Sequence, residues 1–259
     1  MIITALLAYL LEILFPIAIA FWFTRRYHVS WLVVGTGAAA FLLAQALHIP
    51  FLQAVQPLVT DAAPETIKLF VTALFLGLAA GLFEETARVA AYAVLRRRAR
   101  SYQEGIGLGI GHGGAESALF VGLSALISAI TMIVLRGNPG LLHQSAVQLQ
   151  IAYKTFWDSA WYLPFVSLLE RLMAFTIQIS LSLLVLQAFV RRNALWYVAA
   201  VAFHTLVDMT AVLGAGHRWG IAAIEGTVFL FALAAVGIIL ALRPRFSPPP
   251  PEEPPAALS

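Results

Sequence analysis

The sequence predicts an all-α fold, a polytopic integral membrane protein built as a bundle of seven transmembrane helices. Of its 259 residues, 61% are hydrophobic and only 11% are charged, and the mean hydropathy is +0.86. A soluble domain carries about 25% charged residues. The apolar residues form long runs, and clusters of arginine follow every second run. A bilayer can hold this much apolar surface because lipid replaces a second layer of protein.

Seven apolar stretches are long enough to cross a bilayer, which takes about 20 helical residues. They cover residues 3–23, 31–49, 66–95, 103–135, 160–190, 194–214 and 219–242. The longest ones must tilt or project from the membrane. The first stretch lacks a basic leading region and contains Glu12, so we interpret it as a retained span and not as a signal peptide. Strands are not expected, since an open sheet edge cannot face lipid.

The arginines predict the orientation of the chain. They follow the first, third, fifth and seventh stretches, as Arg25, Arg26, Arg96, Arg97, Arg98, Arg100, Arg191, Arg192, Arg243 and Arg245. The alternate connections hold only Lys68, Arg136, Lys154 and Arg218. Because cytoplasmic loops are enriched in basic residues, we expect the N-terminus outside and the C-terminus in the cytoplasm.

Three further segments lie between or beyond the spans. Residues 50–65, with Pro50 and Pro57, are predicted to form a loop, and Pro64 suits the first turn of the next helix. Residues 137–159 are amphiphilic and are expected to lie along the outer surface. Residues 246–259 are rich in proline, so we predict a disordered tail behind one transmembrane domain at residues 1–245.

Composition also excludes several classes of function. The chain has no cysteine, which excludes disulfides, thiolate metal sites and a cysteine nucleophile. The net charge of +3 is small. The arginine clusters that predict the orientation account for this charge, so a nucleic-acid partner is not expected.

Ionisable residues inside the apolar spans are the candidate functional residues, because each is costly in lipid and needs a partner or a role. They are Glu84, Glu85 and Arg88 in the third span, His112 and Glu116 in the fourth, Glu170 and Arg171 in the fifth, and His204 and Asp208 in the sixth. At about 1.5 Å per residue, Glu84, His112 and His204 each lie about 15 Å from the basic end of their span. One carboxylate and two imidazoles at one depth predict a shared site.

Spacing within the helices supports this prediction. Three pairs stand four residues apart and so share a helix face: His112–Glu116, His204–Asp208 and Glu84–Arg88. Arg88 is expected to neutralise Glu84 or Glu85. Glu170 and Arg171 are adjacent, so we expect them to point apart and to find partners on other helices. Gln178 is expected to bridge helices, and the glycines between residues 105 and 114 favour close helix packing.

Two hydrolytic chemistries are compatible with these groups. In the first, which requires no cofactor and is preferred, Glu84 acts as a general base toward water, His112 helps to hold that water, and His204 with Asp208 stabilises the oxyanion. In the second, Zn²⁺ is bound by some of His112, Glu116, His204 and Asp208, with Glu84 or Glu85 as the base. The H-E-x-x-H motif of many metalloproteases is absent.

The polar motifs resemble those of the YhfC family of intramembrane peptidases. They are E-E-x-x-R at 84–88, G-H-G-G-x-E-S at 111–117 and H-x-x-x-D at 204–208, with E-R at 170–171. The resemblance covers most of residues 1–242 and implies an intramembrane protease of glutamic type or metalloprotease type. The family is distantly similar to the CAAX prenyl endopeptidase and bacteriocin-processing superfamily. That similarity implies Glu84 as the catalytic base beside Glu85, with His112 and the His204–Asp208 pair in the second and third motifs.

Two positions depart from the pattern of that superfamily. Arg88 comes one residue early, and Leu108 stands where the superfamily has phenylalanine. A prenylated substrate is therefore not assumed.

The predicted function is hydrolysis of a membrane-embedded or juxtamembrane peptide, with the lipid bilayer of a bacterial plasma membrane as the surroundings. A proton-coupled transporter and a non-catalytic membrane scaffold are the alternatives, since buried charges also form proton relays or pair helices. The sequence shows no internal repeat and no broken helices in corresponding halves, which disfavours the transporter.

Overall fold

The computed structural model describes residues 1–244, except for the Arg97 side chain. Within that part the chain is helical and contains no strand, which confirms the all-α class. Among residues 1–244, seven helices are long and apolar enough to cross a membrane, so the predicted number of spans is confirmed. Arg245 and the tail predicted at 246–259 lie outside the described residues.

Except for α2, the spans match the predicted stretches closely. They are α1 (Ile2–Tyr27), α2 (Trp31–Ala62), α3 (Lys68–Leu95), the continuous helix Tyr102–Gly137, α8 (Leu163–Val190), α9 (Leu195–Gly216) and α10 (Ile221–Ala241). The continuous helix consists of α4 (Tyr102–Ala115), a π-helical segment (Glu116–Gly122, here the π segment) and α5 (Leu123–Gly137). A short 3-10 turn, Arg96–Arg98, follows α3, and the short helices α6 (Pro139–Gln144) and α7 (Val147–Asp158) follow α5.

Local sequence explains where α1, α2 and α4 end or begin. The α1 helix ends with Arg25 and Arg26 in its last turn, next to a left-handed residue, His28. The Ser30 hydroxyl then accepts a hydrogen bond from the Leu32 amide and caps the start of α2. At the start of α4, Ser101 and Glu104 exchange side-chain and backbone hydrogen bonds, which satisfies amides that a helix N-terminus leaves free.

The predicted loop at residues 50–65 is wrong. The α2 helix continues through Pro50 and Pro57 to Ala62, and α3 begins at Lys68, not at Pro64. A proline removes one backbone donor, whereas an unwound segment in lipid would leave several donors and acceptors without partners. Where α2 lies in lipid, this cost favours a continuous helix across prolines that would end a helix in water.

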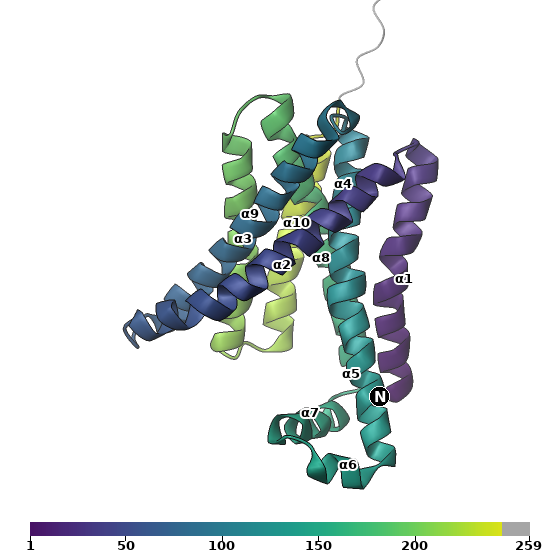
Figure 1. Ribbon diagram of the computed structural model, residues 1–259, viewed down its shortest axis with the longest axis vertical. Helices are drawn as coiled ribbons and strands as arrows, with labels where there is room; N and C mark the ends of the chain where they lie inside the picture. Colours follow the sequence, from purple (N-terminus) through teal and green to yellow (C-terminus); the bar gives the residue numbers. More distant parts are fainter. Residues whose placement is uncertain (245–259) are drawn as a thin grey trace, which may run out of the picture.

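The helices form two ends of unlike charge (Figure 1). One end holds three connections, α1–α2, α3–α4 and α8–α9, and the last residues of α10. The arginine clusters of the sequence lie in these connections and after α10. The N-terminus, the α9–α10 turn and the helices α6 and α7 lie at the opposite end. We call these the arginine end and the N-terminal end. A cytoplasmic arginine end stays a prediction of the basic-residue rule.

Glycines let the helices that carry the site approach closely. The α2 helix crosses the bundle diagonally and packs on α3 and α4 (Figure 1). A Cβ at Gly111 would lie 1.9 Å from the Val34 carbonyl oxygen, and one at Gly37 would lie 2.1 Å from that of Leu108. Backbone therefore meets backbone where α2 crosses α4. Between α3 and α9, a Cβ at Gly77 would lie 2.6 Å from the Thr205 carbonyl oxygen.

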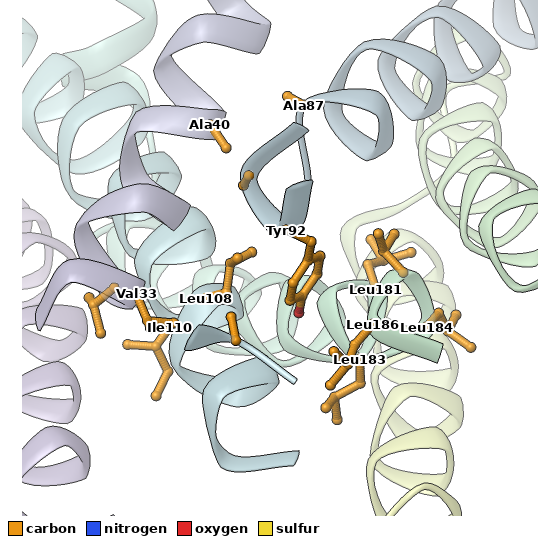
Figure 2. Close-up of a cluster of buried hydrophobic side chains, with 14 of the residues drawn as sticks. Val33, Ala40, Ala87, Tyr92, Leu108, Ile110, Leu181, Leu183, Leu184 and Leu186 are labelled. Carbon is orange, nitrogen blue, oxygen red and sulfur yellow. The ribbon is translucent and has the colours of Figure 1, made fainter. Parts of the chain in front are cut away.

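An apolar core fills the bundle between the polar residues and the arginine end. Figure 2 shows Tyr92 of α3 flanked by Leu108 of α4 and by Leu181 and Leu183 of α8, and all four are fully buried. The Tyr92 hydroxyl donates to the Ser182 carbonyl over 2.9 Å, so this polar atom is also satisfied. Each of these residues stands between a candidate site residue of its helix and the arginine end of that helix.

Candidate functional site

Glu84 lies at the centre of the polar residues. Its Oε2 atom is 3.0 Å from His112 Nε2 and 3.9 Å from His204 Nε2. The exposed fractions of the three residues are 6%, 0% and 4%. Residues from α3, α4 and α9 that the sequence places at one depth are thus brought together in the interior of the bundle.

His204 is oriented by two carboxylates. Its Nδ1 atom is 2.7 Å from Glu85 Oε1, and its Nε2 atom is 3.6 Å from Asp208 Oδ2. Because Glu85 engages Nδ1, the Nε2 atom is left to face Glu84 and Asp208. The Asp208 side chain is 38% exposed, whereas the Glu85 side chain is fully buried.

Arg88 pairs with Glu85 and not with Glu84. Its guanidinium also donates to the Gln178 side-chain oxygen, and both contacts are buried. Arg88 therefore neutralises the charge of Glu85 and not that of Glu84. The Glu84 Oε1 atom accepts a hydrogen bond of 2.9 Å from the Gln45 amide, and no arginine contacts this carboxylate in residues 1–244.

Glu116 faces α8 at the start of the π segment. The Gln178 amide donates to its Oε2 atom over 2.5 Å, and Arg171 donates to its Oε1 atom over 3.1 Å. Glu116 therefore bonds to α8 and not to His112, although the two stand one turn apart. Arg171 also donates to Glu170, so the expectation that these neighbours point apart is wrong. The long arginine side chain folds back far enough to reach the carboxylate beside it.

These contacts form one continuous chain of hydrogen bonds from α9 to α8, which we call the polar chain. It runs through His204, Glu85, Arg88, Gln178, Glu116, Arg171 and Glu170. Every candidate residue of the sequence analysis belongs to this chain or contacts Glu84 or His204 directly.

Gln45 is the site residue that the sequence analysis missed. Its signal was weak, a single amide in an apolar stretch without a neighbouring charge. Gln178 does bridge helices, as expected, because it joins Arg88 of α3 to Glu116 of the π segment.

The donor atoms around Glu84 match zinc in kind. Ligands around a tetrahedral Zn²⁺ ion lie about 3.4 Å from one another. The separations from Glu84 to the two imidazoles and from His204 to Asp208, at 3.0, 3.9 and 3.6 Å, fall on either side of that value. His204 also has the carboxylate behind its other nitrogen that zinc-binding histidines usually have.

Other observations set limits on this match. His112 Nδ1 is buried without a hydrogen-bond partner, and both Glu116 oxygens are engaged by α8. In the described part of the chain, no three His, Asp or Glu side chains are arranged as a metal-binding cluster. Pairs of donors thus lie at separations that suit zinc, and these donors are His112, His204, Glu84 and Asp208. A bound ion would require at least three of them to approach one point together.

Comparison with known proteins places the chain in a family. The family model described as YhfC intramembrane metalloprotease matches residues 11–228, a range that includes every candidate site residue. The chain belongs to the YhfC family. It is also 30% identical over 243 residues to the uncharacterized membrane protein YhfC of Bacillus subtilis (strain 168), covering 86% of this chain and 89% of that protein. No solved structure matches the chain.

Membership of the YhfC family confirms the resemblance drawn from the polar motifs. The family description supports an intramembrane protease and names the metal-dependent type. The three motifs lie on α3, on α4 with the π segment, and on α9, and they meet around Glu84.

Proposed function

We propose that this chain is an intramembrane peptidase in which Glu84 activates the attacking water. The observation that carries the proposal is the Glu84 carboxylate, held in the bundle interior beside two imidazoles at 3.0 and 3.9 Å. Peptide hydrolysis needs a base for water and donors for the oxyanion, and this group offers both. The description of the YhfC family supports the same class of reaction.

In the proposed reaction, the water oxygen attacks the carbonyl carbon of the peptide while Glu84 takes a proton from the water. His112 helps to hold that water, and His204, positioned by Glu85 and Asp208, stabilises the oxyanion. The carbon–nitrogen bond then breaks, and Glu84 passes its proton to the leaving nitrogen. The products are a carboxylic acid and an amine.

A zinc ion would extend this arrangement without changing the role of Glu84 as base. His112, His204 and Asp208 would hold the ion through two nitrogens and a carboxylate. Bound there, zinc would polarise the peptide carbonyl and make a nearby water more acidic. Elemental analysis of the purified protein separates the two types. About one zinc per chain, lost in the His112→Ala–His204→Ala variant, supports the metalloprotease type, whereas zinc-free protein that cleaves peptides supports the glutamic type.

The proposed substrate is a membrane-embedded or juxtamembrane peptide, and the proposed location is a bacterial plasma membrane. A site this deep in the bundle favours a peptide segment that already lies within the bilayer. With the arginine end in the cytoplasm, the N-terminal end would face outward.

The test of the proposed function is cleavage by protein reconstituted in liposomes. Wild-type protein is incubated with a bacterial membrane-protein extract, and new peptide N-termini are identified by mass spectrometry. Wild-type protein should generate new N-termini, and Glu84→Gln and His204→Ala should reduce them by about a thousandfold, since each removes a group from the reacting centre. Glu65→Gln is the matched control, because the Glu65 side chain is 84% exposed. Cleavage that persists in both site variants would overturn the proposal.

A further inference from the structure

The two sides of the site at Glu84 differ in how they are covered. Toward the arginine end, the apolar core closes the site, because Tyr92 and Leu108 have no exposed surface. Toward the N-terminal end, the Asp208 side chain is 38% exposed although it lies 3.6 Å from His204. A peptide and its attacking water therefore reach Glu84 from the N-terminal half of the bundle.

Three residues form the layer of the bundle that follows Glu84 on this side. Ala80 stands one turn before Glu84 on the same face of α3, and Asp208 holds the equivalent place on α9. On α2 this place belongs to His48, three residues after Gln45, whose amide donates to Glu84 over 2.9 Å. Ala80 offers only a methyl group. Of the three, His48 and Asp208 are thus the residues that can form a hydrogen bond with a peptide.

His48 is fixed by its neighbours, but its Nε2 atom has no partner. The ring stacks on that of Phe83, the residue before Glu84, with the ring centres 5.1 Å apart and the planes inclined by 25°. His48 is 7% exposed, and Nε2 is buried without a hydrogen-bond partner in residues 1–244. The residue is also close enough to Glu84 and His204 for their charges to act on it. Because a buried polar atom normally has a partner, the free nitrogen points to a ligand.

Packing alone does not explain an imidazole at this position. A phenylalanine would stack on Phe83 equally well and would bury no polar atom. A metal ion is not the expected ligand either, because among residues 1–244 His48 belongs to no group of three side chains that could hold one.

We infer that His48 is a substrate-binding residue, which forms a hydrogen bond with the peptide backbone beside the bond that is cleaved. A neutral imidazole has one donor and one acceptor, so a carbonyl or an amide of the peptide can satisfy Nε2. In lipid, the backbone groups of a helical peptide bond to one another, whereas a segment unwound for attack leaves some of them free. His48 supplies a partner for one of these groups. The inference rests on the proposed peptidase for the identity of the peptide as a substrate.

Binding measured without cleavage tests His48 separately from the peptidase. The protein carries Glu84→Gln, which stops cleavage, and is placed in lipid nanodiscs. The probes are two fluorescent single-span peptides of leucine and alanine, one with a central proline and one with alanine in its place. Proline leaves the carbonyl four residues before it without a helical partner. The proline peptide should bind about tenfold more tightly, as expected for one additional hydrogen bond.

Three further changes identify the residue that causes this preference. Adding His48→Phe should abolish it, because phenylalanine keeps the stacking on Phe83 and lacks both nitrogens. Adding His48→Asn should retain part of it, since an amide also donates and accepts. His143→Phe is the matched control, because His143 is exposed on α6. Thermal unfolding shows whether each variant is folded, and His48→Leu replaces His48→Phe if the latter does not fold.

Two outcomes would overturn the inference: equal binding of both peptides, or a proline preference that survives His48→Phe. Cleavage of the proline peptide by protein with Glu84 intact is measured in parallel. There, His48→Phe should raise KM about tenfold and change kcat by less than about twofold, as expected for a contact made equally with bound substrate and transition state. A preference that depends on His48 without any cleavage contradicts the peptidase, whereas cleavage with an unchanged KM contradicts the role of His48.

Discussion

The neighbouring helices α8 and α10 pack against each other but have opposite surroundings. In the most apolar 18-residue stretch of each span, 61% of the residues are buried in α8 and 11% in α10. The α8 helix carries Glu170, Arg171 and Gln178, whereas the one charged residue of α10 is Glu225, near its start. Polar residues in this bundle thus occur where protein covers them, since a charge that faces lipid has no partner.

The glycines of the central helix α4 and those of α10 also differ in how closely other atoms approach them. In α4, a Cβ at Gly109 or Gly113 would lie 2.7 or 2.9 Å from atoms of α8. In α10, a Cβ at Gly226 or Gly237 would have no neighbouring atom within 4 Å. The glycines of the central helices are therefore required for contact, and those of α10 are not.

The largest effect on stability is expected from Arg88→Leu in the central region. The guanidinium is fully buried and contacts Glu85 and Gln178, so its removal leaves the Glu85 carboxylate without its cation. Removing one partner of a buried ion pair costs about 3–5 kcal/mol. The free energy of unfolding, measured in mixed micelles of mild detergent and sodium dodecyl sulfate, should fall by that amount. A loss below about 1 kcal/mol, the range of exposed pairs, would show that Glu85 does not depend on Arg88.

A smaller effect, with opposite signs in the two regions, is expected when glycine is changed to alanine. Gly111→Ala forces a methyl group against the Val34 carbonyl oxygen and should lower the free energy of unfolding by about 1–3 kcal/mol. The matched variant Gly237→Ala meets open space and should raise it by about 0.5–1 kcal/mol, because alanine is the better helix former.

The same unfolding assay measures both glycine variants. If they had equal effects, helix propensity and not backbone contact would control both positions, and the contrast between α4 and α10 would have no energetic meaning.

The smallest effect is expected at the N-terminal end, where α7 attaches to α5. The Arg136 guanidinium lies 4.1 Å from the centre of the Trp157 ring. Arg136→Gln removes this cation–π contact, which contributes about 0.5–1 kcal/mol at exposed sites. Hydrogen exchange should become a few times faster in residues 147–158 and stay unchanged in α3. Faster exchange throughout the bundle would instead indicate that α7 supports the central helices.

The sequence predicted the spans well because lipid imposes a length and a composition on each of them. It failed at residues 50–62, where rules for prolines in water predicted a loop and the chain remains helical. The amphiphilic segment at 137–159 forms α6 and α7 at the N-terminal end, and its position on the membrane surface stays a prediction.

Depth along each helix identified the group around Glu84, but not the partner of each side chain. Spacing left either Glu84 or Glu85 as the partner of Arg88, and the contact is with Glu85. Gln45 was missed because a lone amide gives no pattern. Glu116 was assigned to the face of His112, whereas its carboxylate bonds to Arg171 and Gln178 of α8, which spacing within one helix cannot predict.

The π segment also sets the rotation of everything that follows it. The Leu123 amide bonds to the Ala118 carbonyl five residues back, where an α-helix would use four. Wound as an ordinary α-helix with all its residues kept, the segment would rotate α5 by about 100° about its axis. Ala129, Met132 and Leu135, now buried, would then turn toward the acyl chains. The wider winding beside the site, which absorbs one extra residue, thus keeps the far half of a long helix in phase with α1.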